Sequence, residues 1–266
     1  MSRPQVLLLT GYGINCEEET AFAFSRCGAG CRIVHVNDLI DRPEQLQECQ
    51  VFVVPGGFSY GDDTGSGNAL ANKMRHTLWP ELMDFISKDR LVLGICNGFQ
   101  VLVNLGLLPG LDGDYGNRQA ALIANSSTRY ECRWVELQVQ TDRSVFLQNL
   151  DRLQLPVAHG EGRFYVPPAV APRLQANDAI ALTYVDGEGN PADGRFPHNP
   201  NGSLLDIAGI CDDSGKVFGL MPHPERALVA SQLPSWPEIA AGDHPCRWDD
   251  PAPGLALFQN AVNYFL

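Results

Sequence analysis

The first hundred residues alternate short apolar runs with longer segments in which apolar positions recur at helical spacing. Four runs have the length and composition of buried strands, at residues 6–9, 33–36, 51–54 and 91–95. Strands separated by helical segments are typical of βαβ units, which build a parallel sheet covered by helices on both faces. The pattern therefore predicts an α/β fold for this half of the chain.

The first helix is expected between the first two of these strands. Asn15 is predicted as its N-cap, and the acidic residues Glu17, Glu18 and Glu19 lie in the first turn. Carboxylates are favoured there because the first turn of a helix is the positive end of its dipole. The helix is expected to end near Cys27, where glycines follow.

Beyond about residue 118 the apolar runs become shorter and are joined by turns. The runs predicted as strands in this half are 120–124, 132–139, 163–166, 180–185, 206–210 and 216–220. They should extend the same sheet in antiparallel or mixed pairing, because no linker-like segment divides the chain. Loops are expected at 196–202 and 234–253, and an amphipathic helix at 255–265. The predicted architecture is a single domain over residues 1–266, with a mostly parallel central sheet flanked by helices, as in flavodoxin-like folds.

Composition and charge restrict the classes of protein. Hydrophobic residues make up 44% of the 266 positions, which is enough for a packed core. The net charge of −12 repels phosphate backbones and anionic lipids, so no binding to nucleic acid or to a membrane is expected. The chain shows neither a signal-peptide pattern nor a long apolar stretch, and its eight cysteines include no CxxC pair. We therefore expect a cytoplasmic protein with reduced thiols.

The segment most informative about chemistry is Gly-Ile-Cys-Asn-Gly-Phe-Gln at residues 94–100. It places Cys96 between two glycines at the junction of a predicted strand and helix, which is the layout of a nucleophile elbow with Cys in place of Ser. The helix amides would favour the thiolate, and the backbone N–H of Asn97 would be placed to stabilise an oxyanion. On spacing alone, a buried structural cysteine in a glycine-containing turn is an equally good interpretation.

A thiolate nucleophile needs a base, and the base needs an orienting group. The segment Met-Pro-His-Pro-Glu-Arg at 221–226 offers both, because its prolines restrict the backbone and let His223 and Glu225 project to the same side. By itself this turn fits a surface ion pair as well as a catalytic pair. In a chain that also carries the elbow, the catalytic interpretation is the better one.

A third segment, Pro-Gly-Gly-Phe-Ser-Tyr-Gly at 55–61, follows the third predicted strand. Its glycines leave backbone amides unobstructed at the edge where α/β folds place ligands. The N–H of Gly57 is a candidate second oxyanion donor. Without the other two motifs, an ordinary glycine-rich turn would be the more frequent interpretation.

These three segments, in this order, resemble class I (triad-type) glutamine amidotransferases. Residues 57–62, 94–100 with 107–110, and 221–226 are similar, more narrowly, to the family of glutaminase subunits of phosphoribosylformylglycinamidine synthase, and so is 159–164. The resemblance covers about residues 5–226. It departs at 63–67, where small family members carry a Tyr-Leu-Arg-type stretch, and in the longer region that follows Glu225.

The resemblance implies that the chain hydrolyses glutamine for de novo purine biosynthesis, with Cys96 as nucleophile, His223 as general base and then acid, and Glu225 as orienting carboxylate. It implies an oxyanion hole made by the amides of Gly57 and Asn97. The residues that it implies for holding the substrate glutamine are Gln100, His159, Gly160, Gly162 and Phe164. The ammonia is implied to pass to an ATP-dependent formylglycinamide ribonucleotide synthetase subunit, with a small accessory subunit as a further partner. ATP and Mg are expected on that synthetase, and no cofactor or metal ion is expected in this chain.

Other classes fit the sequence less well. A dehydrogenase is disfavoured because no complete G-x-G-x-x-G motif follows a strand, and an ATP-binding P-loop motif is missing as well. A zinc site built on Cys27 and Cys31 is weaker than core packing of the two thiols. Two alternatives remain on the same fold: a cysteine hydrolase of the protease or stress-response type, which would carry His where Asn97 stands, and a non-catalytic binding subunit, in which the triad would be degenerate.

Overall fold

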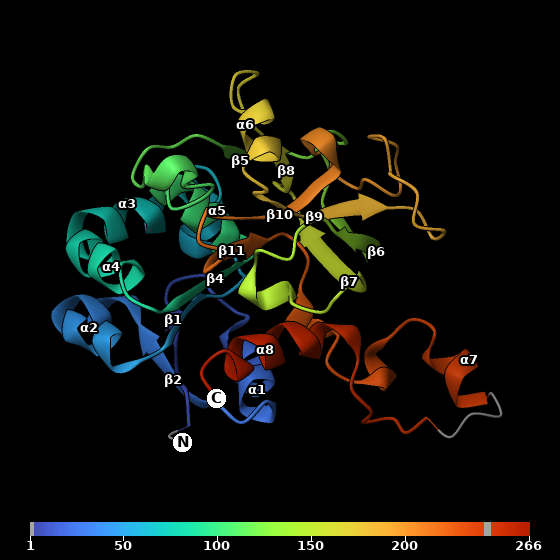
Figure 1. Ribbon diagram of the computed structural model, residues 1–266, viewed down its shortest axis with the longest axis horizontal. Coiled ribbons are helices and arrows are strands. Elements are labelled where there is room, and N and C mark those ends of the chain that lie inside the picture. The colour runs from blue at the N-terminus through green and yellow to red at the C-terminus, as the bar shows by residue number, and fades with distance from the viewer. Residues whose placement is uncertain (1–2, 242–245) are drawn as a thin grey trace.

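The computed structural model describes residues 3–241 and 246–266, which form a nine-stranded sheet with helices on both faces (Figure 1). Five neighbouring strands are parallel: β2 (Gly30–His35), β1 (Gln5–Thr10), β3 (Val51–Val54), β4 (Leu91–Ile95) and β11 (Val217–Leu220). The sheet continues in antiparallel pairing through β10 (Ile207–Cys211), β9 (Ile180–Val185), β6 (Glu131–Val139) and β7 (Arg152–His159). The predicted α/β fold, with a mostly parallel sheet extended by antiparallel strands from the second half, is confirmed.

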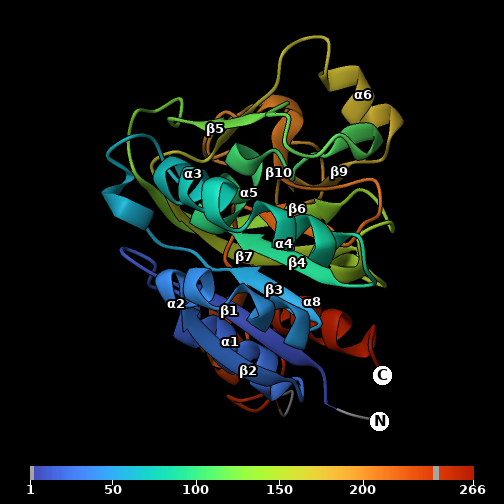
Figure 2. The ribbon, with the colours of Figure 1, turned by 90° about the vertical axis from the view of Figure 1, so that its left-hand side faces the viewer.

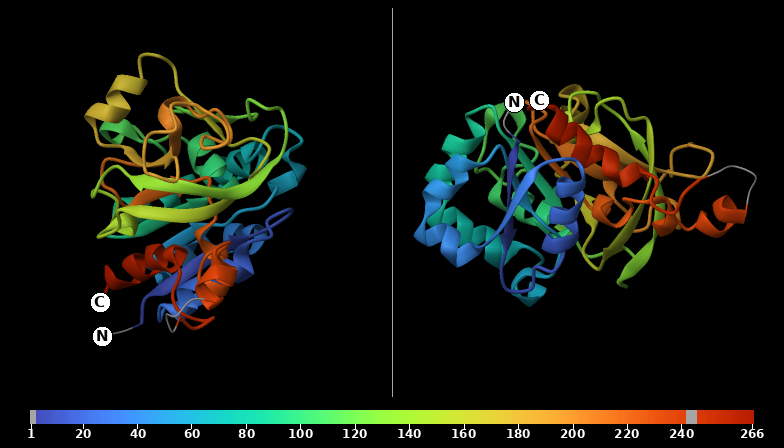
Figure 3. Two further views of the ribbon diagram at one scale, coloured as in Figure 1. Left: turned by 90° about the vertical axis from the view of Figure 1, so that its right-hand side faces the viewer. Right: turned by 90° about the horizontal axis from the view of Figure 1, so that it is seen from below.

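The helices form one layer on each face of the parallel strands. On one face α1 (Glu17–Arg26) packs beside α8 (Pro253–Asn263), with the ring of Phe24 against that of Phe258 (Figure 3). The helices of the other face are α2 (Val36–Asp41), α3 (Asn68–Thr77), α4 (Trp79–Ile86) and α5 (Asn97–Leu105) (Figure 2). No helix of the described residues is long and apolar enough to cross a membrane.

Two predicted boundaries at the start of the chain are wrong. The N-cap of α1 is Cys16 instead of Asn15, and no side chain caps it. Glu17 accepts a hydrogen bond from the Thr10 hydroxyl at 2.7 Å, which ties the first turn to the end of β1. The strand predicted at 33–36 ends at His35, because its Nδ1 accepts the backbone N–H of Asn37 and so starts α2.

The second half differs from the prediction in four elements. β7 was not predicted, because Pro156 interrupts its apolar pattern; it lies at the edge of the sheet, where proline is tolerated. The short strands β5 (Ala121–Ile123) and β8 (Arg163–Tyr165) pair only with each other and do not join the main sheet as expected. The predicted loop 234–253 contains α7 (Trp236–Ala241), which extends away from the sheet, and residues 242–245 of that loop lie outside the described residues (Figure 3).

The elbow between β4 and α5 depends on its two glycines. A Cβ at Gly98 would lie 1.7 Å from the carbonyl oxygen of Val54 in β3, and one at Gly94 would lie 2.7 Å from the carbonyl oxygen of Gly98. The helix therefore starts in backbone contact with the neighbouring strand, which only glycine permits. This contact fixes the residue between the two glycines above the sheet edge.

Gly98→Ala is expected to destabilise the protein by about 3 kcal/mol or more, because the added methyl group must push α5 off the backbone of β3. Urea unfolding of the purified variant measures the change. The matched control is Gly187→Ala, at which a Cβ meets nothing within 4 Å. Equal unfolding midpoints for the two variants would contradict this account of the elbow.

Candidate functional site

The parallel pairing of β4 with β11 brings the two chemical motifs together. Ile95 pairs with Leu220, so Cys96 and His223 follow the carboxyl ends of neighbouring strands. Glu225 comes two residues later, in the single turn Pro224–Arg226. All three side chains are buried, with exposed fractions of 5%, 2% and 1% in chain order. The residues predicted as nucleophile, base and orienting group therefore share one enclosed site.

Cys96 has the strained backbone of a nucleophile elbow. Its φ of 51° and ψ of −106° lie outside the helix and strand regions, and it is the N-cap of α5. Its Sγ is 3.8 Å from the carbonyl oxygen of Ala158 in β7. The thiol thus stands at the amino-terminal end of the nine-residue helix α5.

The imidazole of His223 is held at Nδ1 by Glu225, whose Oε1 lies 2.5 Å away. Burial alone would lower the pKa of His223, but the Glu225 carboxylate and the nearby Cys96 and Cys16 thiols raise it well above its usual value. Nε2 is buried and has no hydrogen-bond partner among the described residues. The ring is therefore oriented at one nitrogen and free at the other, as a general base requires.

The geometry around Gly57 turns its amide away from the loop that follows β1. Ile14 pairs with Gly57 in an isolated antiparallel bridge, whose hydrogen bonds run from Phe58 N–H to Gly13 O and from Asn15 N–H to Gly56 O. In such a pair the N–H of Gly57 points away from Ile14. With φ at +149° and a Cβ position only 2.5 Å from Gly13 O, residue 57 must be glycine.

The side chain of Asn97 joins this loop to α5. Its Oδ1 accepts the N–H of Ser59 at 3.1 Å, and its Nδ2 donates to Gln100 Oε1 at 2.9 Å and to Asp62 Oδ1 at 3.3 Å. Gln100 Nε2 in turn donates to the carbonyl oxygen of Glu161 at 2.6 Å. Gln100 is predicted to hold substrate, and both its Oε1 and its Nε2 are hydrogen-bonded to other residues of the protein.

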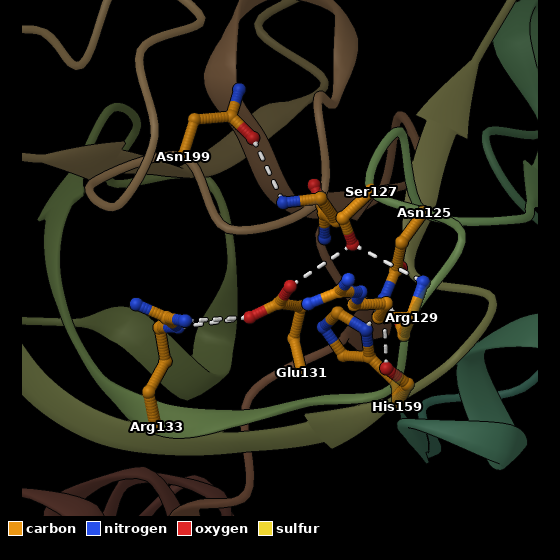
Figure 4. Close-up of polar contacts among 8 residues, drawn as sticks. Asn125, Ser127, Arg129, Glu131, Arg133, His159 and Asn199 are labelled. Atoms are coloured by element: carbon orange, nitrogen blue, oxygen red, sulfur yellow. Dashed lines mark hydrogen bonds and ion pairs between the residues drawn. The ribbon is translucent and has the colours of Figure 1, made fainter.

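The other predicted substrate residues lie in the segment that follows β7. His159 is 2% exposed, and Asn125 holds it through contacts to its Nδ1 at 3.2 Å and its carbonyl oxygen at 2.8 Å (Figure 4). The N–H of Gly162 donates to the same Asn125 at 2.9 Å, while Phe164 is buried and stacks on Phe99. Gly160 accepts the N–H of Asn125 through its carbonyl oxygen. The segment directly follows Ala158, whose carbonyl oxygen contacts Cys96 Sγ, and its His159 and Phe164 side chains are buried.

Burial, and to a smaller extent the neighbouring His223, lower the pKa of His159 to about 4. The unfolded chain, with a histidine pKa near 6.5, binds this proton more readily than the folded one. The free energy of unfolding should therefore fall by about 3 kcal/mol as the pH drops from 7 to 4, with most of the loss below pH 6.5.

Urea unfolding across this pH range should show that loss in the wild-type protein and a shallower slope in His159→Gln. The comparison uses the slope against pH, since the substitution also changes stability at pH 7. The matched control is His76→Gln, which replaces an exposed histidine of α3. The same slope in wild type and His159→Gln would show that His159 is not kept neutral by the fold.

One further residue at this site, Cys16, was not predicted from the sequence. Cys16 is 1% exposed, follows the loop after β1, and its Sγ accepts a hydrogen bond from Arg226 Nη2 at 3.1 Å. Burial raises the pKa of its thiol. One ligand atom each of Cys16, His223 and Glu225 lie within 4.8 Å of one another, so these residues could hold a metal ion. The signal for Cys16 was its place beyond the carboxyl end of β1, the same sheet edge as the elbow.

Two aromatic side chains stand at the surface near the predicted nucleophile. Phe58 is 42% and Tyr130 is 53% exposed, and their ring centroids are 6.3 Å apart. Burial raises the pKa of Tyr130, and the Cys96 thiol close by raises it further. A separate cavity of about 710 Å³ is lined by residues within 138–140, 174–185, 189–194 and 202–206, and none of the three predicted catalytic residues lines it.

The sequence model of one protein family, the CobB/CobQ-like glutamine amidotransferase domain, matches residues 3–265 of the chain. The phosphoribosylformylglycinamidine synthase subunit PurQ of Methanococcus maripaludis is 49% identical over 98% of this chain and 97% of its own length. The corresponding subunit of Dehalococcoides mccartyi is 44% identical over 99% and 98%. Among solved structures, one chain of PurLQS from Thermotoga maritima superposes with a TM-score of 0.70 at 29% identity, covering both chains completely. A second glutamine amidotransferase of that organism shares the fold, with a TM-score of 0.52.

Proposed function

Because this chain belongs to the CobB/CobQ-like glutamine amidotransferases and, among them, to the PurQ subunits of phosphoribosylformylglycinamidine synthase, we propose that Cys96, His223 and Glu225 are its catalytic triad. The chain is the glutaminase subunit of that synthase. The observation that carries the assignment of residues is the buried His223–Glu225 pair, 2.5 Å apart, beside a cysteine with elbow backbone geometry.

The reaction begins when Nε2 of His223 takes the thiol proton and Cys96 Sγ attacks the side-chain amide carbon of glutamine. A carbon–sulfur bond forms, and the amide oxygen becomes an oxyanion that the N–H groups of Gly57 and Asn97 stabilise. His223 then gives its proton to the amide nitrogen, the carbon–nitrogen bond breaks, and ammonia leaves a γ-glutamyl thioester on Cys96. Glu225 keeps Nδ1 protonated and the ring oriented throughout.

Water completes the cycle. His223 removes a proton from a water molecule, whose oxygen attacks the thioester carbon, and the same oxyanion donors serve again. The carbon–sulfur bond breaks, Cys96 recovers its proton through His223, and glutamate is released. One glutamine and one water thus yield one glutamate and one ammonia, with no cofactor in this chain.

The loop from 159 to 164 and Gln100 position the substrate mainly through the shape of the site and through backbone groups, because Gln100 is already hydrogen-bonded at both ends. Gly160 and Gly162 keep this loop close to its neighbours: a Cβ at Gly162 would lie 2.3 Å from the His159 ring. His159 and Phe164 support the loop from beneath.

Ammonia at neutral pH is mostly ammonium and a poor nucleophile, so its release is useful only next to an enzyme that captures it. The partner in this proposal is the formylglycinamide ribonucleotide synthetase subunit, which would bind ATP and Mg, together with a small accessory subunit. The complex would work in the cytoplasm. Its docking elements would be residues 61–67 and the segment 234–253, which carries the protruding α7.

The synthetase should raise kcat/KM for glutamine hydrolysis by about tenfold or more, as gating by a partner implies. The physical reason is burial: only 5% of Cys96 is exposed in the isolated subunit, so glutamine needs a rearrangement to reach it. The N–H of Ser66 donates to Glu161 Oε2 at 3.0 Å, and so links the docking segment to the loop that contacts Gln100.

Steady-state release of glutamate by the purified subunit, with and without synthetase, ATP and ribonucleotide, measures this activation. The variant Glu161→Gln tests the hydrogen bond between Ser66 and Glu161. Glu188→Gln, in an exposed turn, is its control. Full activity of the isolated subunit, unchanged by the partner, contradicts the coupling. No glutamate release under any of these conditions contradicts the proposed function itself.

A further inference from the structure

Arg226 directly follows the proposed triad carboxylate, and its guanidinium contacts groups from two segments of the chain. Its Nη2 donates a hydrogen bond to Cys16 Sγ at 3.1 Å, and its Nε lies 3.9 Å from Glu225 Oε1. A further contact, at 3.8 Å, joins Nη2 to Glu19 Oε1 in the first turn of α1. The proposed reaction uses neither Arg226 nor Cys16, although the guanidinium connects the turn that carries the base to the loop that follows β1.

The Glu225 carboxylate is held through one of its oxygens. Oε1 lies 2.5 Å from His223 Nδ1 and 3.9 Å from the Arg226 guanidinium, while Oε2 has no hydrogen-bond partner among the described residues. The side chain is fully buried, where an unpaired carboxylate oxygen is costly. Of the residues that the structure describes, Arg226 alone brings a permanent positive charge within 4 Å of this carboxylate. The orientation of Glu225 therefore depends on where the guanidinium is held.

Cys16 accepts the hydrogen bond of Arg226 as a neutral thiol. Its side chain is 1% exposed, and burial raises the pKa of the thiol. Its Sγ donates to Asn15 Oδ1 at 3.2 Å, which leaves the sulfur lone pairs for Arg226. One atom each of Cys16, His223 and Glu225 lie within 4.8 Å of one another. The thiol therefore lies against the proposed base and its carboxylate while it holds the guanidinium.

The loop that carries Cys16 also holds the proposed oxyanion donor. The backbone N–H of Cys16 donates to the carbonyl oxygen of Gly56 at 3.2 Å, and Ile14 pairs with Gly57 in the antiparallel bridge. A Cβ at Gly56 would lie 3.1 Å from Cys16 Sγ and 2.9 Å from His223 Cε1. The loop, the thiol and the imidazole are therefore in close contact. A displacement of Cys16 is passed on to both Gly57 and His223.

We propose that Arg226 and Cys16 are positioning residues, whose hydrogen bond fixes the proposed general base relative to the proposed oxyanion hole. The inference rests on the proposed function, because it assigns both residues a role in that reaction. Neither side chain forms or breaks a bond with glutamine. They determine whether the base and the oxyanion donor meet the substrate at the same time, and a displacement of about 1 Å at such a site costs on the order of 10²-fold in rate.

Arg226→Gln should lower kcat for glutamine hydrolysis in the synthetase complex by on the order of 10²-fold and leave KM within about threefold of wild type. The shorter, neutral amide leaves both Cys16 and Glu225 without their partner. Arg226→Lys keeps the charge but not the planar fork of donors, so it should recover kcat to within about tenfold of wild type. The matched control is Arg195→Gln, whose arginine side chain is 72% exposed and which should leave kcat unchanged.

A double-mutant cycle tests the hydrogen bond between Arg226 and Cys16 itself. Cys16→Ala removes the acceptor and should lower kcat by about tenfold, whereas Cys16→Ser keeps an acceptor and should stay within about threefold of wild type. The double variant Arg226→Gln with Cys16→Ala should be no slower than Arg226→Gln alone, because the bond is already lost there. Ammonia-driven synthesis, measured in the same preparations, should stay at the wild-type rate in every variant and so shows that each one folds and assembles.

Three results overturn the proposal while the wild type still hydrolyses glutamine, so that the proposed function stands. They are an unchanged kcat in Arg226→Gln, a double variant in which the two single effects multiply, and loss of ammonia-driven synthesis in the Arg226 variants. The last result would make Arg226 a structural residue of the complex. A wild-type complex that forms no glutamate overturns the proposed function and this inference with it.

Discussion

Cys96→Ala should lower kcat for glutamine hydrolysis by on the order of 10⁵-fold or more, while ammonia-driven synthesis by the assembled complex persists. The variant removes the only atom that forms the covalent bond to the substrate. It leaves the elbow intact, because its backbone is set by the contacts of Gly94 and Gly98 and not by the thiol. The synthetase therefore still docks and still captures ammonia supplied from solution.

The experiment measures glutamate formation and ribonucleotide amidation in the same preparation, with either glutamine or an ammonium salt as nitrogen source. Cys246→Ala is the matched control, since it removes a thiol far along the chain from the elbow. Near wild-type hydrolysis by Cys96→Ala would mean that another residue is the nucleophile. Loss of the ammonia-driven reaction as well would mean that Cys96 has a structural role in the complex.

His223→Ala should lower kcat by on the order of 10⁵-fold, and Glu225→Gln by a smaller factor, on the order of 10³–10⁴. The histidine transfers the proton in both halves of the reaction, whereas the carboxylate only orients the ring and stabilises its charge. Since Glu225 raises the pKa of His223, the amide in its place leaves a weaker base with a less defined tautomer.

The two variants are compared by steady-state kinetics under conditions in which both are folded, as checked by circular dichroism. The control is Glu238→Gln in α7, a carboxylate on the protruding segment. A Glu225→Gln variant as impaired as His223→Ala would assign proton transfer to the carboxylate. A Glu225→Gln variant with wild-type kcat would remove Glu225 from the triad.

The strands, and the two segments that carry the proposed triad, could be recognised from the sequence because each is specified locally. The runs at 51–54 and 91–95 are buried strands with no competing pattern, and their observed bounds coincide with the prediction. The elbow and the His-Pro-Glu turn depend on glycines and prolines, which restrict the backbone whatever surrounds them. The parallel sheet then decides which of these segments meet at one edge.

Features that depend on contacts between distant segments could not be predicted from the sequence. β7 contains Pro156 and forms a strand only because it lies at the edge of the sheet beside β6. Cys16 resembled any buried cysteine until the order of β1, β3 and β4 placed it beside His223. Gln100 stays a prediction as a substrate residue, and what the sequence did not indicate is that its amide is hydrogen-bonded to Asn97 and to the distant Glu161.

The covalent step is the centre of this account, and rapid acid quenching during turnover tests it most directly. Digestion and mass spectrometry of the quenched complex should find a γ-glutamyl group on the peptide that contains Cys96, and glutamine labelled with ¹⁵N in its amide should leave no ¹⁵N on that peptide. His223→Ala should not accumulate the adduct, because it cannot expel ammonia efficiently. Steady turnover of glutamine with an unmodified Cys96 peptide, or with the adduct on another residue, would contradict the account.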